Sequence, residues 1–411
     1  MSDFMIDLEQ SPENWPRVEL GSICDVGGGF AAPKGEEPFE NGSVPFVRMQ
    51  DLGRYHRTTN LIETKDRLNP DFVQKRRLRI VRKGSILIPR SGSVSLNHRA
   101  ILGTDACIVS HICALTPTRS DVNPQYLYWA LCNFDMRNIM RKTTGLDAIT
   151  FEDVRHVRIP LPPLDVQRNI AAALRRAERV QQLRQQANQL TNKIIQSVFL
   201  KMFGDPVSNE NHWPVKTIRE VAEKVSDGPF GSNLKTEHYT TEGVRVIRLQ
   251  NIGVGEFLDD DKVFISLEHY SKLKKHTCIP GDVIVGTLGD PNLRACILPA
   301  HVKVAINKAD CIQVRPNKNF LNAAYLCHLL NTPQMLRLAS SYIHGETRTR
   351  ISMSQVASLQ IPIPSLSVQE EYAQILRHFD HVYANQKRSS EVINELFHSL
   401  MYKAFRGELA A

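Results

Sequence analysis

Hydrophobic residues along this chain are spaced in two alternating ways. In residues 1–163 and again in residues 205–363, short runs of β-branched and aliphatic residues lie between turns rich in Gly, Pro and Asn, a pattern typical of strands. The runs that predict strands are 44–49, 85–88, 101–108, 154–159, 244–249, 282–285 and 302–306. One helix is predicted in each part, over 124–142 and 322–340, so both parts are expected to be α+β domains.

Each of these parts is followed by a long stretch with helical spacing, 164–204 and 364–411. Hydrophobic positions there step by three and four, as they do along the contact seam of a coiled coil. The predicted seam positions are Val180, Leu183, Ala187, Leu190 and Ile194 in the first stretch and Tyr372, Ile375, Phe379, Val382, Gln386, Ser389, Ile393, Leu396 and Leu400 in the second. Helices of about 38 residues would each be roughly 57 Å long.

Both long helices carry signals at their ends. Asp165 is a predicted cap for the first helix, and Ser367 with Glu370 forms a predicted capping box for the second. Gly204 and Gly407 are the predicted terminators, because glycine enters the left-handed region without strain.

The sequence also repeats itself at an offset of about 200 residues. Trp15-Pro16 returns as Trp213-Pro214, and the segment 44–53 returns as 244–253. The predicted organisation is a first domain at 1–163, a helix at 164–204, a second domain at 205–363 and a second helix at 364–411. The simplest arrangement pairs the helices as an antiparallel coiled coil with one domain at each end and pseudo-twofold symmetry. In the alternative, each helix packs on its own domain.

Composition and charge narrow the class of protein. The chain has 411 residues and a net charge of +8, and no apolar run approaches the roughly 18–20 residues that cross a bilayer. With an acidic N-terminus that lacks a signal-peptide pattern, a cytoplasmic protein without a membrane contact is expected. The eight cysteines form no CxxC pair, which favours reduced core residues over a zinc site.

Catalytic motifs are missing from the sequence. Asn123-Pro124-Gln125-Tyr126 differs from the Asn-Pro-Pro-aromatic loop of amino-methyltransferases, and it is interpreted as a helix start. The sequence contains neither a Walker loop nor a nucleophile elbow. No catalytic residue, no metal ligand and no bound cofactor is predicted for this chain.

Segments suited to DNA contact occur in both halves. They are Gly-rich loops with basic or amide residues, polar turns at 142–145 and 344–350, and an acid-free basic run at 74–103. Arg48 and Arg248 also occupy equivalent places in the repeated strand, each followed by a glutamine two residues later. For the basic run the alternative is a solvated charged face, and for each loop it is an ordinary surface turn. The candidate DNA-binding residues are Lys34, Arg48, Gln50, Arg76, Arg77, Arg90, Ser91, Ser93, Thr144, Asn233, Lys235, Arg248, Gln250, Thr287, Arg348 and Arg350.

The whole chain resembles the specificity (S) subunits of type I restriction–modification systems. The resemblance rests on segments 160–167 and 361–369, which open the long helices, and on segments 199–205 and 401–408, which close them. The loop Asp227-Gly-Pro-Phe-Gly-Ser232 is also similar to one common in the family, whereas Gly27-Gly-Gly-Phe30 departs from the usual first loop.

This resemblance implies two target recognition domains, each reading half of a bipartite, asymmetric site in double-stranded DNA with a fixed gap. The helices would set the gap and dock two methyltransferase (M) subunits, and restriction (R) subunits would join that core. S-adenosylmethionine, ATP and Mg are expected in the partner subunits. Three alternatives to a DNA-recognition subunit of a restriction system stay open. One is an enzyme with a degenerate catalytic motif, and two are binding proteins. Of these two, one is a coiled-coil adaptor that binds only protein, and the other is the recognition subunit of a methylation-only defence system.

Overall fold

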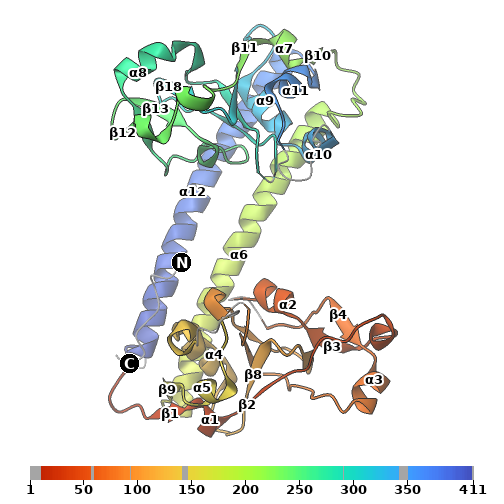
Figure 1. The fold of residues 1–411 in the computed structure, drawn as a ribbon, viewed down its shortest axis with the longest axis vertical. Coiled ribbons are helices and arrows are strands. Elements are labelled where there is room, and N and C mark those ends of the chain that lie inside the picture. The colour runs from red at the N-terminus through yellow and green to blue at the C-terminus, as the bar shows by residue number, and fades with distance from the viewer. Residues whose placement is uncertain are drawn as a thin grey trace. The chain divides into compact units, whose positions relative to one another are not determined.

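The computed structural model describes residues 11–56, 60–92, 94–140, 147–289, 291–341 and 350–409, and the chain divides into two compact units (Figure 1). Unit 1 comprises residues 1–186 and 387–411, and unit 2 comprises residues 187–386. The long helices α6 (Leu164–Phe203) and α12 (Leu366–Phe405) each begin in one unit and end in the other. Each unit therefore contains a globular domain, the beginning of the helix that follows it and the end of the other long helix.

Unit 1 contains three small sheets in its described residues. The antiparallel four-stranded sheet has the order β2 (Cys24–Gly28), β8 (Ile112–Pro117), β5 (Ile86–Pro89), β6 (Ala100–Ile101). The second sheet has the order β4 (Asp66–Leu68), β3 (Val44–Val47), β7 (Cys107–Ile108), and its β3–β7 pair is parallel. Strand β1 (Arg17–Glu19) pairs with β9 (Arg158–Pro160). The short helices are α1 (Leu20–Ile23), α2 (Met49–Arg54), α3 (Pro70–Lys75), α4 (Pro124–Asn133) and α5 (Phe151–Arg155).

Unit 2 repeats this topology. Its four-stranded sheet has the order β11 (Ala222–Ser226), β19 (Cys311–Pro316), β16 (Val283–Gly286), β17 (Ala295–Ile297). The second sheet has the order β12 (Tyr239–Thr240), β14 (Val263–Ile265), β13 (Val244–Ile247), β18 (Ala305–Asn307), β15 (Thr277–Cys278), and β10 (Val215–Thr217) pairs with β20 (Gln360–Pro362). The short helices are α7 (Ile218–Val221), α8 (Leu267–Lys272), α9 (Ala323–Leu330), α10 (Pro333–Ser341) and α11 (Met353–Ser358). Apart from the added β12 and β15, the strand orders of the two units correspond.

Several predicted boundaries are wrong for local reasons. The run 101–108 contains parts of two strands, because a bend at residues 103–104 separates β6 of the four-stranded sheet from β7 of the second sheet. Val154 belongs to α5, where Thr150 and Asp153 form a capping box. The helix predicted over 322–340 is divided into α9 and α10, and Pro333 opens the second.

The predicted C-terminal ends of the long helices are confirmed, whereas the predicted N-terminal caps are wrong. Gly204 and Gly407 have φ values of 77° and 73°, which confirms both as left-handed terminators. The helices begin at Leu164 and Leu366, so Asp165 and Ser367 lie inside the first turn. The predicted N-cap positions are therefore each wrong by two residues.

A buried glutamine joins each long helix to the domain before it. Gln167 is 1% exposed; its Oε1 accepts the backbone N–H of Asn123 at 2.8 Å, and its Nε2 donates to the carbonyls of Asp121 and Pro162 at 2.9 and 2.8 Å. Tyr126 adds a bond from its hydroxyl to the carbonyl of Pro160 at 2.7 Å. Both N–H groups of the Gln167 amide and one lone pair of its Oε1 are thus engaged at the junction of α4, α6 and β9.

The same junction recurs in unit 2. Gln369 is fully buried; its Oε1 accepts the N–H of Asn322 at 2.8 Å, and its Nε2 donates to the carbonyls of Phe320 and Pro364 at 3.0 and 2.8 Å. The hydroxyl of Tyr325 donates to the carbonyl of Pro362 at 2.8 Å. The repeated Pro-x-Pro…Val-Gln segments are therefore a structural joint.

The opposite ends of the long helices complete the two cores. In unit 1, Phe405 of α12 packs against Tyr126, with ring centroids 5.7 Å apart. In unit 2, Phe203 of α6 packs against Tyr325 at 4.7 Å and against Tyr372 of α12 at 5.2 Å. Each domain core thus depends on both long helices.

The predicted seam of α6 is wrong. Val180, Leu183, Leu190 and Ile194 are between 48% and 58% exposed, whereas the buried middle positions of α6 are Glu178, Thr191 and Ile195. On α12 the prediction is partly wrong, since Tyr372 is buried but Val382 and Leu396 are exposed. Hydrophobic spacing identified a stripe on α6, but that stripe faces solvent.

Hydrogen bonds between polar side chains connect α6 with α12. In unit 1, Gln181 Nε2 donates to Asn394 Oδ1 at 2.9 Å. In unit 2, Gln386 Nε2 donates to Thr191 Oγ1 at 2.8 Å, and the hydroxyl of Tyr383 donates to Asn192. Gln386, a polar residue among the predicted seam positions of the second helix, does contact the other helix.

Glu178 gives a pH-dependent prediction. It is 7% exposed, its Oε1 lacks a hydrogen-bond partner among the described residues, and burial raises its pKa to about 7. Because the unfolded carboxyl ionises near 4.5, the cost of keeping it folded grows between pH 4.5 and 7 and then stays at about 3 kcal/mol. Glu178→Gln is expected to raise the melting temperature of unit 1 clearly at pH 8 and much less at pH 5, measured by calorimetry. An equal rise at both pH values would show that ionisation is not responsible.

Candidate nucleic-acid interface

Arg48 and Arg248 occupy equivalent positions after β3 and β13, and the structure holds both in the same way. The Arg48 N–H donates to Asp51 Oδ2 at 2.9 Å, and its guanidinium pairs with Asp66 above the ring of Phe46, 5.3 Å from the centroid. A guanidinium has five N–H donors, so this ion pair leaves others to meet a ligand.

The Arg248 arrangement repeats these contacts with different partners. Its N–H donates to Asn251 Oδ1 at 2.9 Å, and its Nε donates to Asp261 Oδ2 at 2.8 Å. The guanidinium carbon lies 5.8 Å from the centroid of Tyr239, and the hydrogen bond with Asp261 raises the pKa of Arg248. Gln50 and Gln250, two residues further on in each unit, are exposed. A preorganised arginine beside an exposed amide therefore occurs once in each unit.

Two glycines of the candidate loops lie where a larger side chain would collide with the backbone. A Cβ on Gly29 would lie 1.7 Å from the carbonyl oxygen of Ile108, and one on Gly228 would lie 2.2 Å from that of Asn307. These close approaches seat each loop against the parallel strand of the second sheet, β7 or β18. Lys34 follows the first loop and is exposed, as are Asn233 and Lys235 in the second. The carbonyl of Asn233 accepts from His269 Nε2 at 2.8 Å, and Lys235 pairs with Glu237 at 3.4 Å.

The segment after β5 carries Arg90 and Ser91. Arg90 Nε donates to the carbonyl of Ser110 at 3.2 Å, and its guanidinium carbon lies 5.0 Å from the ring centroid of Phe151. Ser91 Oγ lies 2.7 Å from His111 Nδ1. Both residues are partly exposed, so the segment is ordered by these contacts while remaining accessible.

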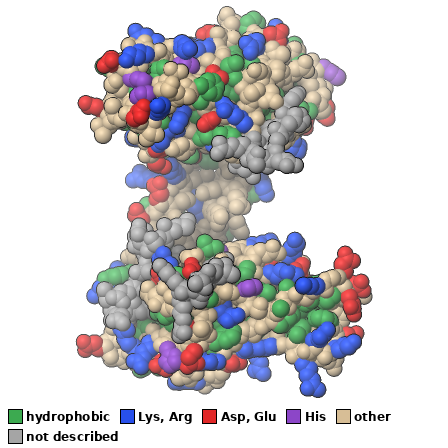
Figure 2. Space-filling model, viewed as in Figure 1, with side chains coloured by type: hydrophobic (Ala, Val, Ile, Leu, Met, Phe, Trp, Pro, Cys, Tyr) green, Lys and Arg blue, Asp and Glu red, His purple; other side chains and the backbone are tan. Residues whose placement is uncertain are grey.

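The basic run 74–103 is not a single patch. Arg76 and Arg77 are exposed at the end of α3, and Arg77 adopts a positive φ of 48°. Arg79 instead pairs with Asp25 at 2.7 Å, and Arg99 is 1% exposed and donates to the carbonyls of Leu131 and Phe134. Figure 2 shows Lys and Arg interspersed with Asp and Glu over the visible face of each unit. The predicted continuous phosphate-facing run is therefore wrong at Arg99, which has a structural role.

One candidate must be withdrawn and three cannot be placed. Thr287 is fully buried and its hydroxyl donates to the carbonyl of Asp310 at 2.9 Å, so its side chain has no access to DNA. Ser93, Thr144 and Arg348 lie outside the described residues.

Phe230, beside Arg350, is a candidate DNA-contacting residue that was not predicted from the sequence, because it carries no charge. The guanidinium carbon of Arg350 lies 5.8 Å from the ring centroid of Phe230, which is 50% exposed, and Arg350 pairs with Asp310 at 3.4 Å. An exposed aromatic ring beside an arginine is suited to stack on or wedge against bases. The signal in the sequence was Phe230 within the Asp-Gly-Pro-Phe-Gly-Ser loop.

Burial makes the cysteine thiols of this chain unreactive. All eight cysteines are buried and free, and burial raises the pKa of the Cys24 thiol to about 12. Among the residues that the structure describes, no group of three or more His, Cys, Asp or Glu side chains could hold a metal ion. Within the same residues, no helix has the length and apolar character needed to span a bilayer.

Comparison with known proteins identifies the class that this repeated architecture defines. The family described as type I restriction modification DNA specificity domain matches twice, over residues 12–193 and 210–395. The chain therefore belongs to this family and is a type I restriction–modification specificity subunit with two target recognition domains.

Individual relatives match along nearly the whole chain. The type I restriction enzyme MjaVIII specificity subunit of Methanocaldococcus jannaschii is 20% identical over 97% of this chain and 93% of its own length. A chain solved in work on complex assembly and conformational transition of the type I restriction–modification system aligns with a TM-score of 0.56 at 20% identity, covering 97% of this chain and 99% of that chain. The type I restriction–modification S subunit from M. genitalium aligns with a TM-score of 0.53 at 15% identity, covering 95% and 96%. These structures share the fold.

Proposed function

We propose that this chain is the non-catalytic subunit that reads a bipartite, asymmetric DNA site, with one half-site contacted by each domain and an unread gap between them. The observation that carries this proposal is the repeat itself. The strand orders of the two units correspond apart from β12 and β15, and an Arg-x-Gln segment follows the equivalent strands β3 and β13. The equivalent loops differ in sequence: Gly27–Lys34 corresponds to Ser226–Lys235, and Arg90-Ser91 corresponds to Thr287-Leu288. Equivalent scaffolds with different loops favour different half-sites.

The helices are proposed to form an antiparallel coiled coil that fixes the gap. In unit 2, Thr191 contacts Gln386 and Asn192 contacts Tyr383, so residue numbers rise along one helix as they fall along the other. The unit 1 contact between Gln181 and Asn394 follows the same order. An antiparallel pair of equal helices, each beginning at one domain, would give the pseudo-twofold symmetry that the sequence repeat suggests.

The same helices are proposed to dock two methyltransferase (M) subunits, which would bring S-adenosylmethionine. The support is the exposed stripe of α6, formed by Val180, Leu183, Leu190 and Ile194, which we call the α6 stripe. Apolar residues at coiled-coil spacing that face solvent are suited to bind further helices. Restriction (R) subunits, carrying ATP and Mg, would join this core. The same surface also suits a methylation-only system, and the fate of unmethylated target DNA in vivo distinguishes the two.

Exchange of one domain tests the reading of half-sites. Replacing residues 205–363 with the corresponding domain of a relative, while keeping α6 and α12, is expected to change one half-site completely. The other half-site and the gap should stay the same, because unit 1 and the helices are unaltered. The measurement is genome-wide methylation mapping in cells that express the hybrid with its partners. If a pure protein-binding adaptor were the correct function, methylated sites would not change with the exchange.

A further inference from the structure

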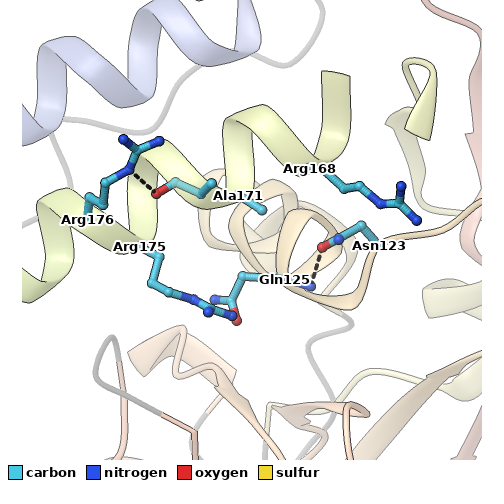
Figure 3. A pocket seen from close by; sticks show the side chains of 7 residues that line it. Asn123, Gln125, Arg168, Ala171, Arg175 and Arg176 are labelled. Carbon is cyan, nitrogen blue, oxygen red and sulfur yellow. Dashed lines mark hydrogen bonds between the residues drawn. The ribbon is translucent and has the colours of Figure 1, made fainter. Parts of the chain in front are cut away.

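An open cavity of about 310 Å³ lies in unit 1 between the start of α4 and the second to fourth turns of α6 (Figure 3). Its lining residues are Asn123, Gln125, Arg168, Ala171, Ala172, Arg175 and Arg176. The set contains three guanidinium groups and no carboxylate. None of the candidate DNA-binding residues belongs to it.

The three arginines are available to a ligand. Among the described residues, none of them forms an ion pair, in contrast to Arg48, Arg79 and Arg155 of the same unit. Arg175 extends to the amide of Gln125, and Arg176 turns back along α6, where its Nε donates to the carbonyl of Ala172 at 3.2 Å (Figure 3). All three are exposed. Glu178, whose pKa is raised by burial and lowered to a smaller extent by the charge of Arg175, does not line the cavity.

The helix end itself adds little to this charge. Asn123 Oδ1 already accepts the N–H groups of Gln125 and Tyr126 at 3.0 Å, and Pro124 has no N–H. The anion-binding character therefore comes from the side chains of α6. Arginine forks bind carboxylates in bidentate geometry.

The counterpart in unit 2 argues against DNA as the ligand. Gln167 and Gln369 make the same contacts, so the next residues, Arg168 and Glu370, are equivalent. By the same offset, Arg377 and His378 stand where unit 1 has Arg175 and Arg176, so unit 2 keeps one of the three guanidinium groups and adds a carboxylate. A surface that follows the evenly charged DNA backbone past both units would not place a carboxylate at one of two equivalent positions. A protein partner tolerates such a difference.

The cavity continues the α6 stripe. Arg176 lies four residues before Val180 and seven before Leu183, so these three side chains share one side of the helix. A partner helix seated on the stripe would reach the cavity with its next turns. Resting on the proposed docking of methyltransferase subunits, we propose that this cavity binds an Asp or Glu side chain of the partner that docks beside unit 1. Only one of the two partners gains this contact, so the two copies bind with unequal affinity.

The test uses the full-length chain and the methyltransferase subunit of its own system. In a titration followed by calorimetry and native mass spectrometry, the wild type is expected to bind the first copy more tightly than the second. Arg168→Glu with Arg175→Glu should weaken the first binding step on the order of 10–100-fold and abolish its salt dependence, while the second step stays as it was. Arg168→Lys with Arg175→Lys retains the charge and should lose far less. Unchanged melting of unit 1 controls for folding, and Arg219→Glu, an exposed reversal in unit 2, controls for net charge.

Additional variants distinguish a failure of the proposed carboxylate site from a failure of the proposed docking of methyltransferase subunits. Leu183→Glu with Ile194→Glu should prevent docking; if it has no effect, or if the wild type binds no partner, the docking proposal itself fails. If the stripe variant loses the partner while the arginine variants bind like the wild type, only the carboxylate site is refuted. A photocrosslinker at Ala172 should capture a partner peptide that contains Asp or Glu. Capture of DNA, or of a peptide without an acidic residue, contradicts the assignment.

Discussion

Deleting residues 182–188 from α6 and 387–393 from α12 is expected to shorten the gap in the recognised DNA site by about three base pairs and to leave both half-sites unchanged. Seven helical residues span about 10.5 Å, and a base pair rises about 3.4 Å. Seven residues are also nearly two full turns, so the faces of each helix rotate by only about 20°. The deletion lies between the contact of Gln181 with Asn394 and the contact of Thr191 with Gln386, so both contacts can reform.

The measurement is methylation of a DNA library in which the two half-sites are separated by every gap length over one helical turn. A matched control replaces the exposed residues of the same segments with alanine without changing their length, and its preferred gap should equal that of the wild type. A deletion variant that keeps the original gap, or that changes the bases read in either half-site, would refute the role of the helices as a spacer.

Replacing Gln369 with Leu is expected to destabilise unit 2 by about 3–5 kcal/mol. Leucine has a similar volume but leaves the N–H of Asn322 and the carbonyls of Phe320 and Pro364 without their partners in a fully buried site. Each unsatisfied buried group costs about 1–3 kcal/mol, and relaxation at the start of α12 recovers part of the sum. Gln167→Leu should have the same effect on unit 1, because its three bonds have the same partners in the repeat.

Calorimetry of the two variants checks this prediction, with each substitution lowering the melting transition of its own unit. Gln374→Leu is the control, because this residue lies on the same helix but is exposed. A similar loss in the control would mean that added surface hydrophobicity is responsible. Methylation that tolerates base changes in the affected half-site, while the other half-site is still read, would connect the joint to DNA reading.

The sequence predicted the large features because they repeat or because they extend over many residues. The offset of about 200 residues predicted two equivalent domains, and the strand orders of the two units agree with it. The long helices end at the predicted glycines. The role of the repeated Gln167 and Gln369 was not predicted, because two of the three partners of each come from a segment more than 40 residues away.

The errors have physical causes that a single sequence does not reveal. Spacing showed that Val180, Leu183, Leu190 and Ile194 share a face of α6, but spacing cannot tell whether a face meets the neighbouring helix or solvent. Burial of Thr287 depends on the carbonyl of Asp310 across a strand, and burial of Arg99 depends on the end of α4. For the candidate DNA contacts, residue type suggested which loops to consider, and the structure shows which of their side chains are accessible.

The composition of unit 1 has a consequence for synthesis on the ribosome. Its core includes Met401, Ala404 and Phe405, whereas unit 2 contains only residues 187–386. The domain translated first is consequently the last to complete its core, since Tyr126 waits for Phe405 to emerge. Unit 2 can close while the ribosome is still extending α12, and premature termination within the last turns of that helix would leave the N-terminal domain with an open apolar face.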